Sequence, residues 1–247
     1  LTGIAHIEEL TGKKFGDPEN PLLVSVRSGA PVSMPGMMDT VLNLGLNDVT
    51  VEGLAAKSGN ARFAWDSYRR FITMFGDVVL GIHYTRFARV TDQVRNGREE
   101  SELSIDELKH LVGQLKAVIE EGHGSFPAHP EDQLRLATNA VFRSFNTPRA
   151  RYYRKSQGIP ENTGTAVNIQ AMVFGNMGDT SATGVCFTRD PKNGERIFFG
   201  EWLPNAQGED VVAGTHTPGP LTSDQKGAEG VALNDAMPAI YEELDRI

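Results

Sequence analysis

Apolar residues recur every three or four positions over much of the chain, a spacing that is typical of helices with one buried face. The pattern predicts a helix over 1–10, several helices between 47 and 122, another after Pro130, and a last one near 241–247. Ser104 and Glu107 have the spacing of a capping box, so one helix is expected to begin there. The aromatic residues of the second region are expected to pack between helices: Phe63, Tyr68, Phe71 and Phe75.

Other segments have the pattern of strands. The apolar run over 21–29 ends at Gly29 and predicts a buried strand, whereas 165–174 alternates. That alternation places four apolar side chains on one face: Val167, Ile169, Ala171 and Val173. Further strands are expected over 183–189, 196–203 and 210–213, with a turn at 190–194 between the first two. Strands, then helices, then strands again indicate an α+β fold.

Composition and charge narrow the class of protein. The 247 residues carry a formal charge of −8, which argues against nucleic acid as a partner. No run of roughly 18 apolar residues suggests a membrane span, and no signal peptide is evident, so a cytoplasmic protein is expected. The single cysteine, Cys186, excludes an internal disulfide and is expected to be a buried strand residue. Neither end carries a helix start or stop signal, which indicates a piece of a longer protein.

The common nucleotide and catalytic motifs are missing. The chain has no P-loop, no glycine-rich dinucleotide fingerprint, no paired histidines at metal-ligating spacing and no nucleophile elbow. The informative segment is instead 25–40. Arg27 comes near the end of the predicted buried strand, and the loop that follows contains Gly29, Gly36 and the hydroxyls of Ser28 and Ser33. A guanidinium beside a glycine loop suits the oxygens of a polyphosphate, although an ordinary surface turn fits the composition equally well.

Six segments together strongly resemble the pyruvate, phosphate dikinase family, and the Met-Pro-Gly-Met-Met block within the second is highly specific. They follow one another along nearly the whole chain: 24–30, 33–48, 64–76, 164–176, 181–185 and 205–214. The resemblance implies an ATP-grasp nucleotide-binding domain. Its first lobe would comprise 1–46 and 126–172, its helical insert 47–125, and its second, incomplete lobe 173–247.

The resemblance also implies a reaction and its partners. This family uses ATP with Mg²⁺ and inorganic phosphate to phosphorylate a carrier histidine. A swivelling domain bears that histidine, and a separate barrel passes the phosphoryl group to pyruvate, giving phosphoenolpyruvate, AMP and diphosphate. The parent protein is expected to be a homo-oligomer.

Carried over to this sequence, the resemblance assigns phosphate-side residues. Arg27 would bind phosphate with Ser28 beside it, and Arg70 would be a second phosphate-side arginine, unless it is only a charge on the helix surface. A mobile loop over the polyphosphate would contain Gly36, Met37 and Met38.

The remaining assignments concern the rest of the nucleotide. A hinge strand would read the adenine edge through its backbone, with the residues Gln170, Ala171, Met172 and Val173, although a plain core strand explains its apolar alternation equally well. Thr183 would lie near the nucleotide. Glu209 and Asp210 would contact the ribose or a cation, or else be solvated loop charges.

Two departures from the family pattern concern positive charge. Arg-Ala is expected where Pro31 and Val32 stand, and arginine where His216 stands.

The family's acidic metal ligands should follow Ile247, and its carrier-histidine motif is nowhere in the sequence. This chain by itself is therefore expected to be catalytically inactive, or to bind ATP only weakly.

Alternatives remain open at this point. A related dikinase, such as a phosphoenolpyruvate synthase or an antibiotic phosphotransferase, shares the domain. A nucleotide-binding or interaction module without catalysis is the other alternative. Five cations without an intervening acid, between Arg143 and Lys155, would either border the phosphate site or form a solvated helix end.

Overall fold

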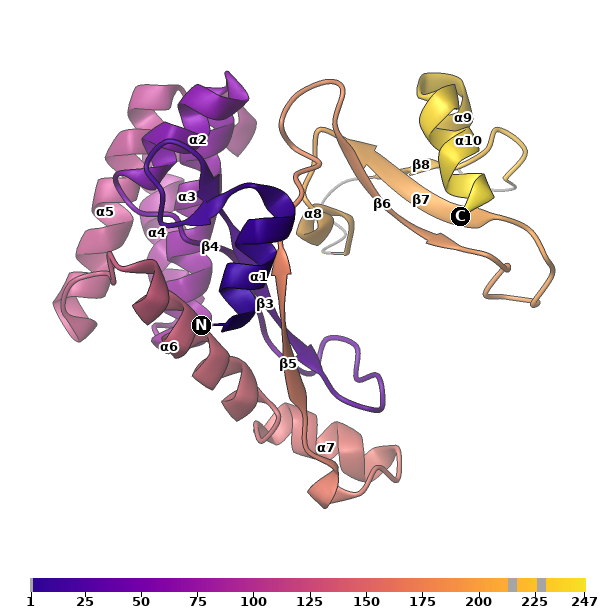
Figure 1. Ribbon diagram of the computed structural model, residues 1–247, viewed down its shortest axis with the longest axis horizontal. Coiled ribbons are helices and arrows are strands. Elements are labelled where there is room, and N and C mark those ends of the chain that lie inside the picture. Colours follow the sequence, from indigo (N-terminus) through magenta and orange to yellow (C-terminus); the bar gives the residue numbers. More distant parts are fainter. Residues whose placement is uncertain (1, 213–216, 226–229) are drawn as a thin grey trace. The chain divides into compact units, whose positions relative to one another are not determined.

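The computed structural model describes residues 2–212, 217–225 and 230–247 (Figure 1). The chain forms two compact units, Leu1–Met172 (unit 1) and Val173–Ile247 (unit 2). The described strands of each unit pair only within that unit, and each unit has its own buried side chains. Within the described ranges, no helix combines the length and the hydrophobicity needed to cross a bilayer.

Unit 1 is mainly helical, and local signals explain where its helices begin. The Oγ atom of Ser104 accepts a hydrogen bond from the Glu107 amide at 3.3 Å, and the Glu107 carboxylate accepts one from the Ser104 amide at 2.9 Å, so the predicted capping box is confirmed. The predicted helices over 1–10 and after Pro130 are also confirmed. The helical elements are α1 (Thr2–Thr11), α2 (Thr50–Ser58), α3 (Ala61–Met74), a π-helical turn (Phe75–Val79), α4 (Tyr84–Arg95), a 3-10 turn (Glu100–Glu102), α5 (Ile105–His123), α6 (Pro130–Ser144), α7 (Pro148–Ser156) and a second 3-10 turn (Glu161–Thr163).

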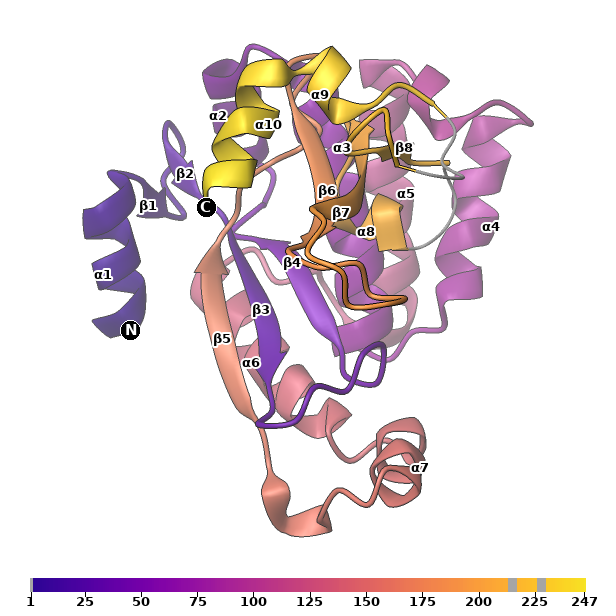
Figure 2. The same ribbon diagram turned by 90° about the vertical axis from the view of Figure 1, so that its right-hand side faces the viewer.

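Three strands of unit 1 form an antiparallel sheet in the order β4-β3-β5 (Figure 2). They are β3 (Val24–Gly29), β4 (Thr40–Leu44) and β5 (Ala166–Ala171). The strand predicted over 21–29 is divided, because β2 (Pro21–Leu22) pairs with β1 (Lys14–Phe15) in a separate sheet. Strand β4 was not predicted, since a short apolar run without alternation has no distinctive period.

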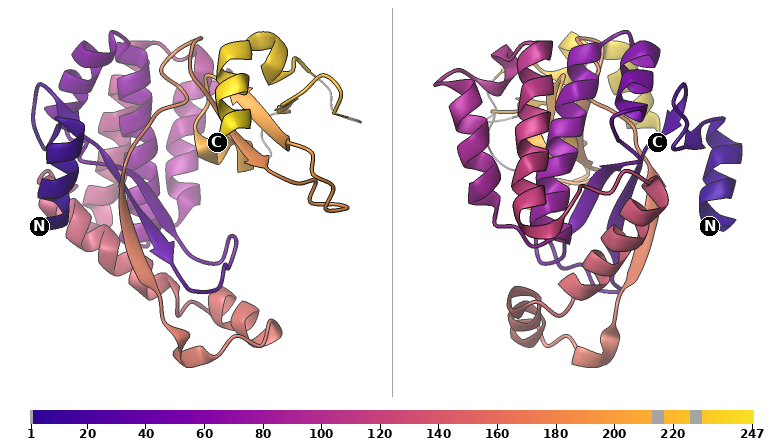
Figure 3. Two further views of the ribbon diagram at one scale, coloured as in Figure 1. Left: turned by 45° about the vertical axis from the view of Figure 1, so that its right-hand side comes forward. Right: turned by 90° about the vertical axis from the view of Figure 1, so that its left-hand side faces the viewer.

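Two packed layers hold unit 1 together. Helix α6 lies against the sheet and contacts all three of its strands (Figure 3). The expected aromatic packing is confirmed between the helices, where Phe71, Phe75 and Phe126 meet edge to face with ring centroids 5.4–5.6 Å apart. Such contacts add to the stabilisation that burial of the rings provides.

Unit 2 contains a three-stranded antiparallel sheet, β6-β7-β8 (Figure 1). Its buried cluster consists of Trp202, which lies on β7, with Leu221 and Leu233. Its elements are β6 (Ala182–Phe187), β7 (Phe199–Pro204), α8 (Gly208–Val212), β8 (Gly219–Pro220), α9 (Leu233–Ala236) and α10 (Pro238–Arg246). The predicted turn at 190–194 is confirmed by the hydrogen bond from the Gly194 amide to the Asp190 carbonyl, 2.8 Å.

Two expectations for unit 2 are wrong. Of the strand predicted at 210–213, residues 210–212 instead belong to helix α8, where the Asp210 carboxylate accepts a hydrogen bond from the Gln207 amide at 2.8 Å and favours a helical turn, and Ala213 lies outside the described residues. Cys186 is exposed, not buried, because it lies on β6, an edge strand of the sheet.

Candidate functional site

Arg27 lies on the central strand of the unit 1 sheet, and strand geometry determines which side chains accompany it. Successive side chains of a strand point to opposite faces. Val24 and Val26 are fully buried on one face, whereas Ser25 and Arg27 share the other. The Arg27 side chain is exposed, although the strand that carries it is buried over its first half.

Strand pairing adds further polar side chains to this face. Residues directly opposite each other in an antiparallel pair share a face, and Ser25 faces Gln170 while Arg27 faces Asn168. The Nε atom of Arg27 donates to the Ser25 hydroxyl at 3.2 Å, and that hydroxyl donates to the Gln170 carbonyl at 3.5 Å. We call Ser25, Arg27, Asn168 and Gln170 the polar sheet face.

Sequence reasoning missed two members of the polar sheet face, Ser25 and Asn168. The signal was present, because polar residues alternate with apolar ones in Val24-Ser-Val-Arg and in Val167-Asn-Ile-Gln. Only the register, which sets Ser25 against Gln170, shows that the two polar rows lie together.

The other predicted residues of this region lie elsewhere. Ser28 belongs to the face opposite Arg27, as does Ala171. The expected hinge strand ends at Ala171, and the Met172 amide adds one more hydrogen bond, to the Leu23 carbonyl at 2.9 Å. Val173 is 90% exposed and lies beyond the strand, so the interpretation of 170–173 as one continuous core strand is wrong.

The loop at 30–39, between β3 and β4, contains a tight turn at 34–37. The Met37 amide donates to the Met34 carbonyl at 3.1 Å, and Gly36 has a φ of +69°. Proline followed by a residue with positive φ is the sequence of a type II turn. Met34 is buried, Met37 and Met38 are half-buried, and Gly36 is exposed.

The end of this loop contacts two helices. The Asp39 amide donates to the Ser144 hydroxyl of α6 at 3.1 Å, and the Asp39 carboxylate lies 3.3 Å from the Arg149 guanidinium of α7. Burial raises the pKa of Asp39 above its ordinary value, Arg149 opposes this rise, and Asp77 adds to it.

Arg70 is held by a buried carboxylate. Its Nε atom donates to Asp66 Oδ2 at 2.9 Å, while Asp66 Oδ1 accepts from Arg69 Nε at 2.9 Å. Arg69 is itself paired with Glu100 at 2.7 Å. Burial alone would raise the pKa of Asp66, but Arg69 and Arg70 together outweigh it and lower that pKa. Arg70 is therefore a fixed guanidinium, not a mobile charge on the helix surface.

The predicted residues of unit 2 gather near the start of α8. The Thr183 hydroxyl lies 3.9 Å from the position that a Cβ atom on Gly208 would take. Beside it, Gln207 is only 4% exposed, and neither polar atom of its amide has a hydrogen-bond partner in the described part of the chain. Asp210 is the third residue of α8, whereas the Glu209 side chain and His216 lie outside the described residues.

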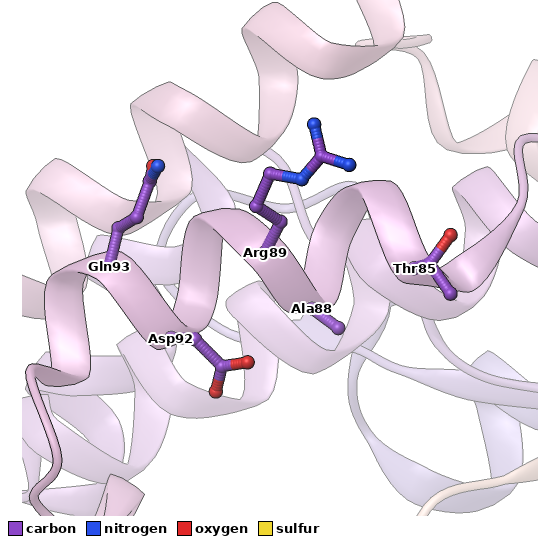
Figure 4. A pocket seen from close by; sticks show the side chains of 5 residues that line it. All are labelled: Thr85, Ala88, Arg89, Asp92 and Gln93. Atoms are coloured by element: carbon purple, nitrogen blue, oxygen red, sulfur yellow. The ribbon is translucent and has the colours of Figure 1, made fainter.

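Two features outside these groups do not form a site. A surface depression is lined by five residues of α4 alone, Thr85, Ala88, Arg89, Asp92 and Gln93, and includes no predicted site residue (Figure 4). The five cations between 143 and 155 are not one surface, because Arg154 is buried against the Phe145 ring, 3.9 Å from its centroid. Among the described residues, no group of three potential ligands is placed to hold a metal ion.

Comparison with known proteins adds independent information. A family model described as "Pyruvate phosphate dikinase, AMP/ATP-binding domain" matches residues 2–239. Pyruvate, phosphate dikinase of Clostridium symbiosum is 54% identical over 246 residues, which cover 98% of this chain and 27% of that protein. The protein of that name from Giardia intestinalis is 55% identical (98% and 27% covered), and "Pyruvate, phosphate dikinase 1, chloroplastic" of Arabidopsis thaliana is 53% identical (99% and 25% covered). The chain spans about a quarter of the length of these curated relatives.

Proposed function

Since this chain belongs to the pyruvate phosphate dikinase AMP/ATP-binding domain family, we propose that it binds ATP and positions its phosphates within a longer pyruvate, phosphate dikinase. The observation that supports this most directly is the exposed Arg27 side chain, which Ser25 anchors at Nε. A guanidinium that is held at Nε keeps its terminal N–H groups directed outward as a fork, and that fork matches the oxygens of a phosphate group.

The proposed fold is an ATP-grasp domain. Its first lobe comprises 1–46 and 126–172, its helical insert 47–125, and its second lobe 173–247. The sheet with helix α6 in unit 1 and the separate antiparallel sheet of unit 2 are compatible with this division.

The polar sheet face and the 30–39 loop supply the proposed phosphate contacts. Arg27 binds one phosphate group, with the backbone of Ser28 next to it although the Ser28 side chain lies on the opposite face of the sheet. Arg70, fixed by Asp66, provides a second positive charge. The loop carries three residues over the polyphosphate: Gly36, Met37 and Met38. Its type II turn presents exposed backbone at Gly36, where a close approach to an anion meets no side chain.

The rest of the nucleotide is assigned to residues 170–173 and to three residues of unit 2. The backbone groups of Gln170, Ala171, Met172 and Val173 read the adenine edge. Thr183 lies near the nucleotide, and Glu209 and Asp210 contact the ribose or a cation. The support for this part is the resemblance and the closeness of Thr183 to the start of α8.

The reaction belongs to the parent protein. We propose that it transfers a phosphoryl group from ATP to a carrier histidine with inorganic phosphate as co-substrate, and from there to pyruvate in a barrel domain. Fixed cations accelerate phosphoryl transfer by stabilising the charge on the transferred group. Arg27 and Arg70 can supply this charge, but the sequence contains no carrier-histidine motif, so the chain by itself is expected to bind ATP without turning it over.

Among the described residues, no cluster of His, Cys, Asp or Glu side chains is placed to hold a resident Mg²⁺ ion. We propose that the ion arrives with ATP and that its acidic ligands lie beyond Ile247.

Calorimetry tests the site directly. ATP with Mg²⁺ is titrated into the 247-residue chain, into an Arg27→Ala variant and into an Arg135→Ala control, whose side chain is 65% exposed on α6. Loss of a hydrogen bond to a charged group predicts an affinity at least about tenfold weaker for Arg27→Ala. Equal affinities for Arg27→Ala and the unmodified chain would remove Arg27 from the site.

A second measurement separates the related dikinases. The full-length parent is assayed for ATP cleavage with and without inorganic phosphate. A strict requirement for phosphate is expected, and cleavage that needs only water would favour a phosphoenolpyruvate synthase-like reaction.

A further inference from the structure

The 30–39 loop is anchored on both sides of an exposed turn. Before the turn, Met34 is buried at 8% exposure. After it, the Asp39 amide donates a hydrogen bond to the hydroxyl of Ser144, which is 1% exposed. Between these two anchors, Pro35 and Gly36 are exposed. The conformation of the turn therefore depends on how firmly the residues that follow it are held.

Arg149 of α7 holds those residues by two contacts. Its Nη2 atom lies 3.3 Å from Asp39 Oδ1 and 3.5 Å from the Met37 carbonyl oxygen. One guanidinium nitrogen thus contacts a side chain and a backbone oxygen two residues apart, which its two N–H donors allow. Met37 is the last residue of the turn at 34–37, so the contact restrains the turn itself.

The helix that carries Arg149 is anchored to its neighbour. Thr147 caps α7 by accepting a hydrogen bond from the Ala150 amide at 3.3 Å, and its hydroxyl donates to the Ser144 carbonyl at 3.0 Å. Arg154, which is 1% exposed, donates to the Phe145 carbonyl from the next turn of α7. Arg149 therefore acts from a fixed base.

We propose that Arg149 is a positioning residue that sets the 30–39 loop in the conformation that closes over the phosphates of the nucleotide. The inference rests on the proposed role of this loop in ATP binding. In this proposal Arg149 does not itself contact the phosphates; its Nη2 atom contacts Asp39 and the Met37 carbonyl.

The first experiment measures the order of the loop without nucleotide. A nitroxide is attached at Ser33→Cys in a Cys186→Ser background, since Cys186 is the only cysteine of the chain and is exposed. The spectral line is expected to narrow in Arg149→Ala, which indicates faster motion of the loop. It is expected to stay unchanged in Arg151→Ala, a matched control for an exposed arginine two residues further along α7. An unchanged line in Arg149→Ala overturns the proposal.

The second experiment measures ATP affinity by calorimetry on the same chain. Arg149→Ala is expected to raise the dissociation constant about fivefold, which is near the most that an exposed ion pair contributes. Asp39→Ala should act similarly, and the double variant should lose no more than the larger single loss, because both changes remove one interaction. Circular dichroism confirms that each variant remains folded.

The outcomes distinguish the positioning role of Arg149 from the proposed binding of ATP. A mobile loop with unchanged ATP affinity shows that Arg149 orders the loop without positioning it for the nucleotide, and overturns the inference. A fully additive double variant also overturns it, since Arg149 would then act independently of Asp39. If the unmodified chain does not bind ATP while the loop still becomes mobile in Arg149→Ala, the proposed function fails and the contact between α7 and the loop stands as a structural one.

Discussion

The Asp66 carboxylate holds the Arg70 guanidinium at its Nε atom, with 2.9 Å between Nε and Oδ2, and the same carboxylate receives Arg69 on its other oxygen. Asp66 and Arg69 are both buried, whereas the Arg70 side chain is 23% exposed. The buried part of this network thus fixes the base of a guanidinium whose far end reaches the surface. Such an arrangement orients a charge without burying it completely.

Removing this carboxylate is expected to destabilise the protein. Asp66→Asn removes the buried carboxylate that pairs with Arg69. The loss is expected to lower the unfolding free energy by about 3 kcal/mol at neutral pH. Asp132→Asn is the matched control, because its carboxylate is 52% exposed and pairs with Arg135 at 3.2 Å; a cost below about 1 kcal/mol is expected there. Urea denaturation followed by circular dichroism measures both.

The cost of Asp66→Asn should depend on pH. The folded-state pKa of Asp66 is lowered below its ordinary value, so the ionised carboxylate stabilises the fold above the unfolded-state pKa of about 3.9. This stabilisation is lost as the pH falls through the lowered folded-state pKa. The difference in unfolding free energy between the two proteins should therefore narrow below about pH 4, and a difference independent of pH would contradict the assigned ion pair.

Gly36→Ala tests the turn of the 30–39 loop. A side chain at a φ of +69° costs about 1 kcal/mol even though the space around it is open. Gly59→Ala is the control, because Gly59 ends α2 with a φ of +65° and also faces open space. Both variants should lose similar stability in thermal unfolding, but only Gly36→Ala should weaken ATP binding in calorimetry. Equal ATP affinities in the two variants would count against a role of the turn in nucleotide binding.

Two helical glycines should respond oppositely to alanine. A Cβ atom on Gly53 of α2 would lie 2.0 Å from the Pro18 carbonyl oxygen, so Gly53→Ala must displace backbone and should cost about 3 kcal/mol. Gly113 of α5 has no neighbour within 4 Å of its Cβ position, and Gly113→Ala should stabilise the protein by up to about 1 kcal/mol. Denaturant midpoints measure both changes, and destabilisation by Gly113→Ala would show that the α5 surface is not open.

The start of α5 offers a test of local electrostatics. The pKa of Glu107 is lowered to about 2. The hydrogen bond from Arg98 is the largest cause, and the hydrogen bonds from Ser104 are the next largest. Arg98→Ala should raise this pKa toward its ordinary value of about 4.3, as measured by NMR titration of the side-chain carboxyl carbon. Arg95→Ala, which removes a partner of Asp92 instead, should leave the pKa of Glu107 unchanged; a similar rise in both variants would indicate a general charge effect.

Much of the local structure could be predicted from the sequence. The capping box at Ser104, the helix after Pro130 and the turn at 190–194 depend on residues close together in the chain, so the sequence contains all of the information they need. Errors arose where local preference was weak or tertiary contacts overrode it. The segment predicted as a strand at 210–213 has the β-branched residues Val211 and Val212, but the Asp210 carboxylate accepts a hydrogen bond from the Gln207 amide, and residues 210–212 belong to helix α8.

The sequence by itself determined the family, the types of most elements and the presence of Arg27 on a strand next to a glycine-containing loop. Only the tertiary structure decided which residues accompany Arg27. Ser25 meets Gln170 across 145 positions of sequence, and Arg149 meets Asp39 across 110. Strand register and helix packing bring these pairs together, and both follow from burial of side chains across the whole of unit 1. A pattern read along the chain contains the period of each element but not the rotation and register with which two distant elements meet.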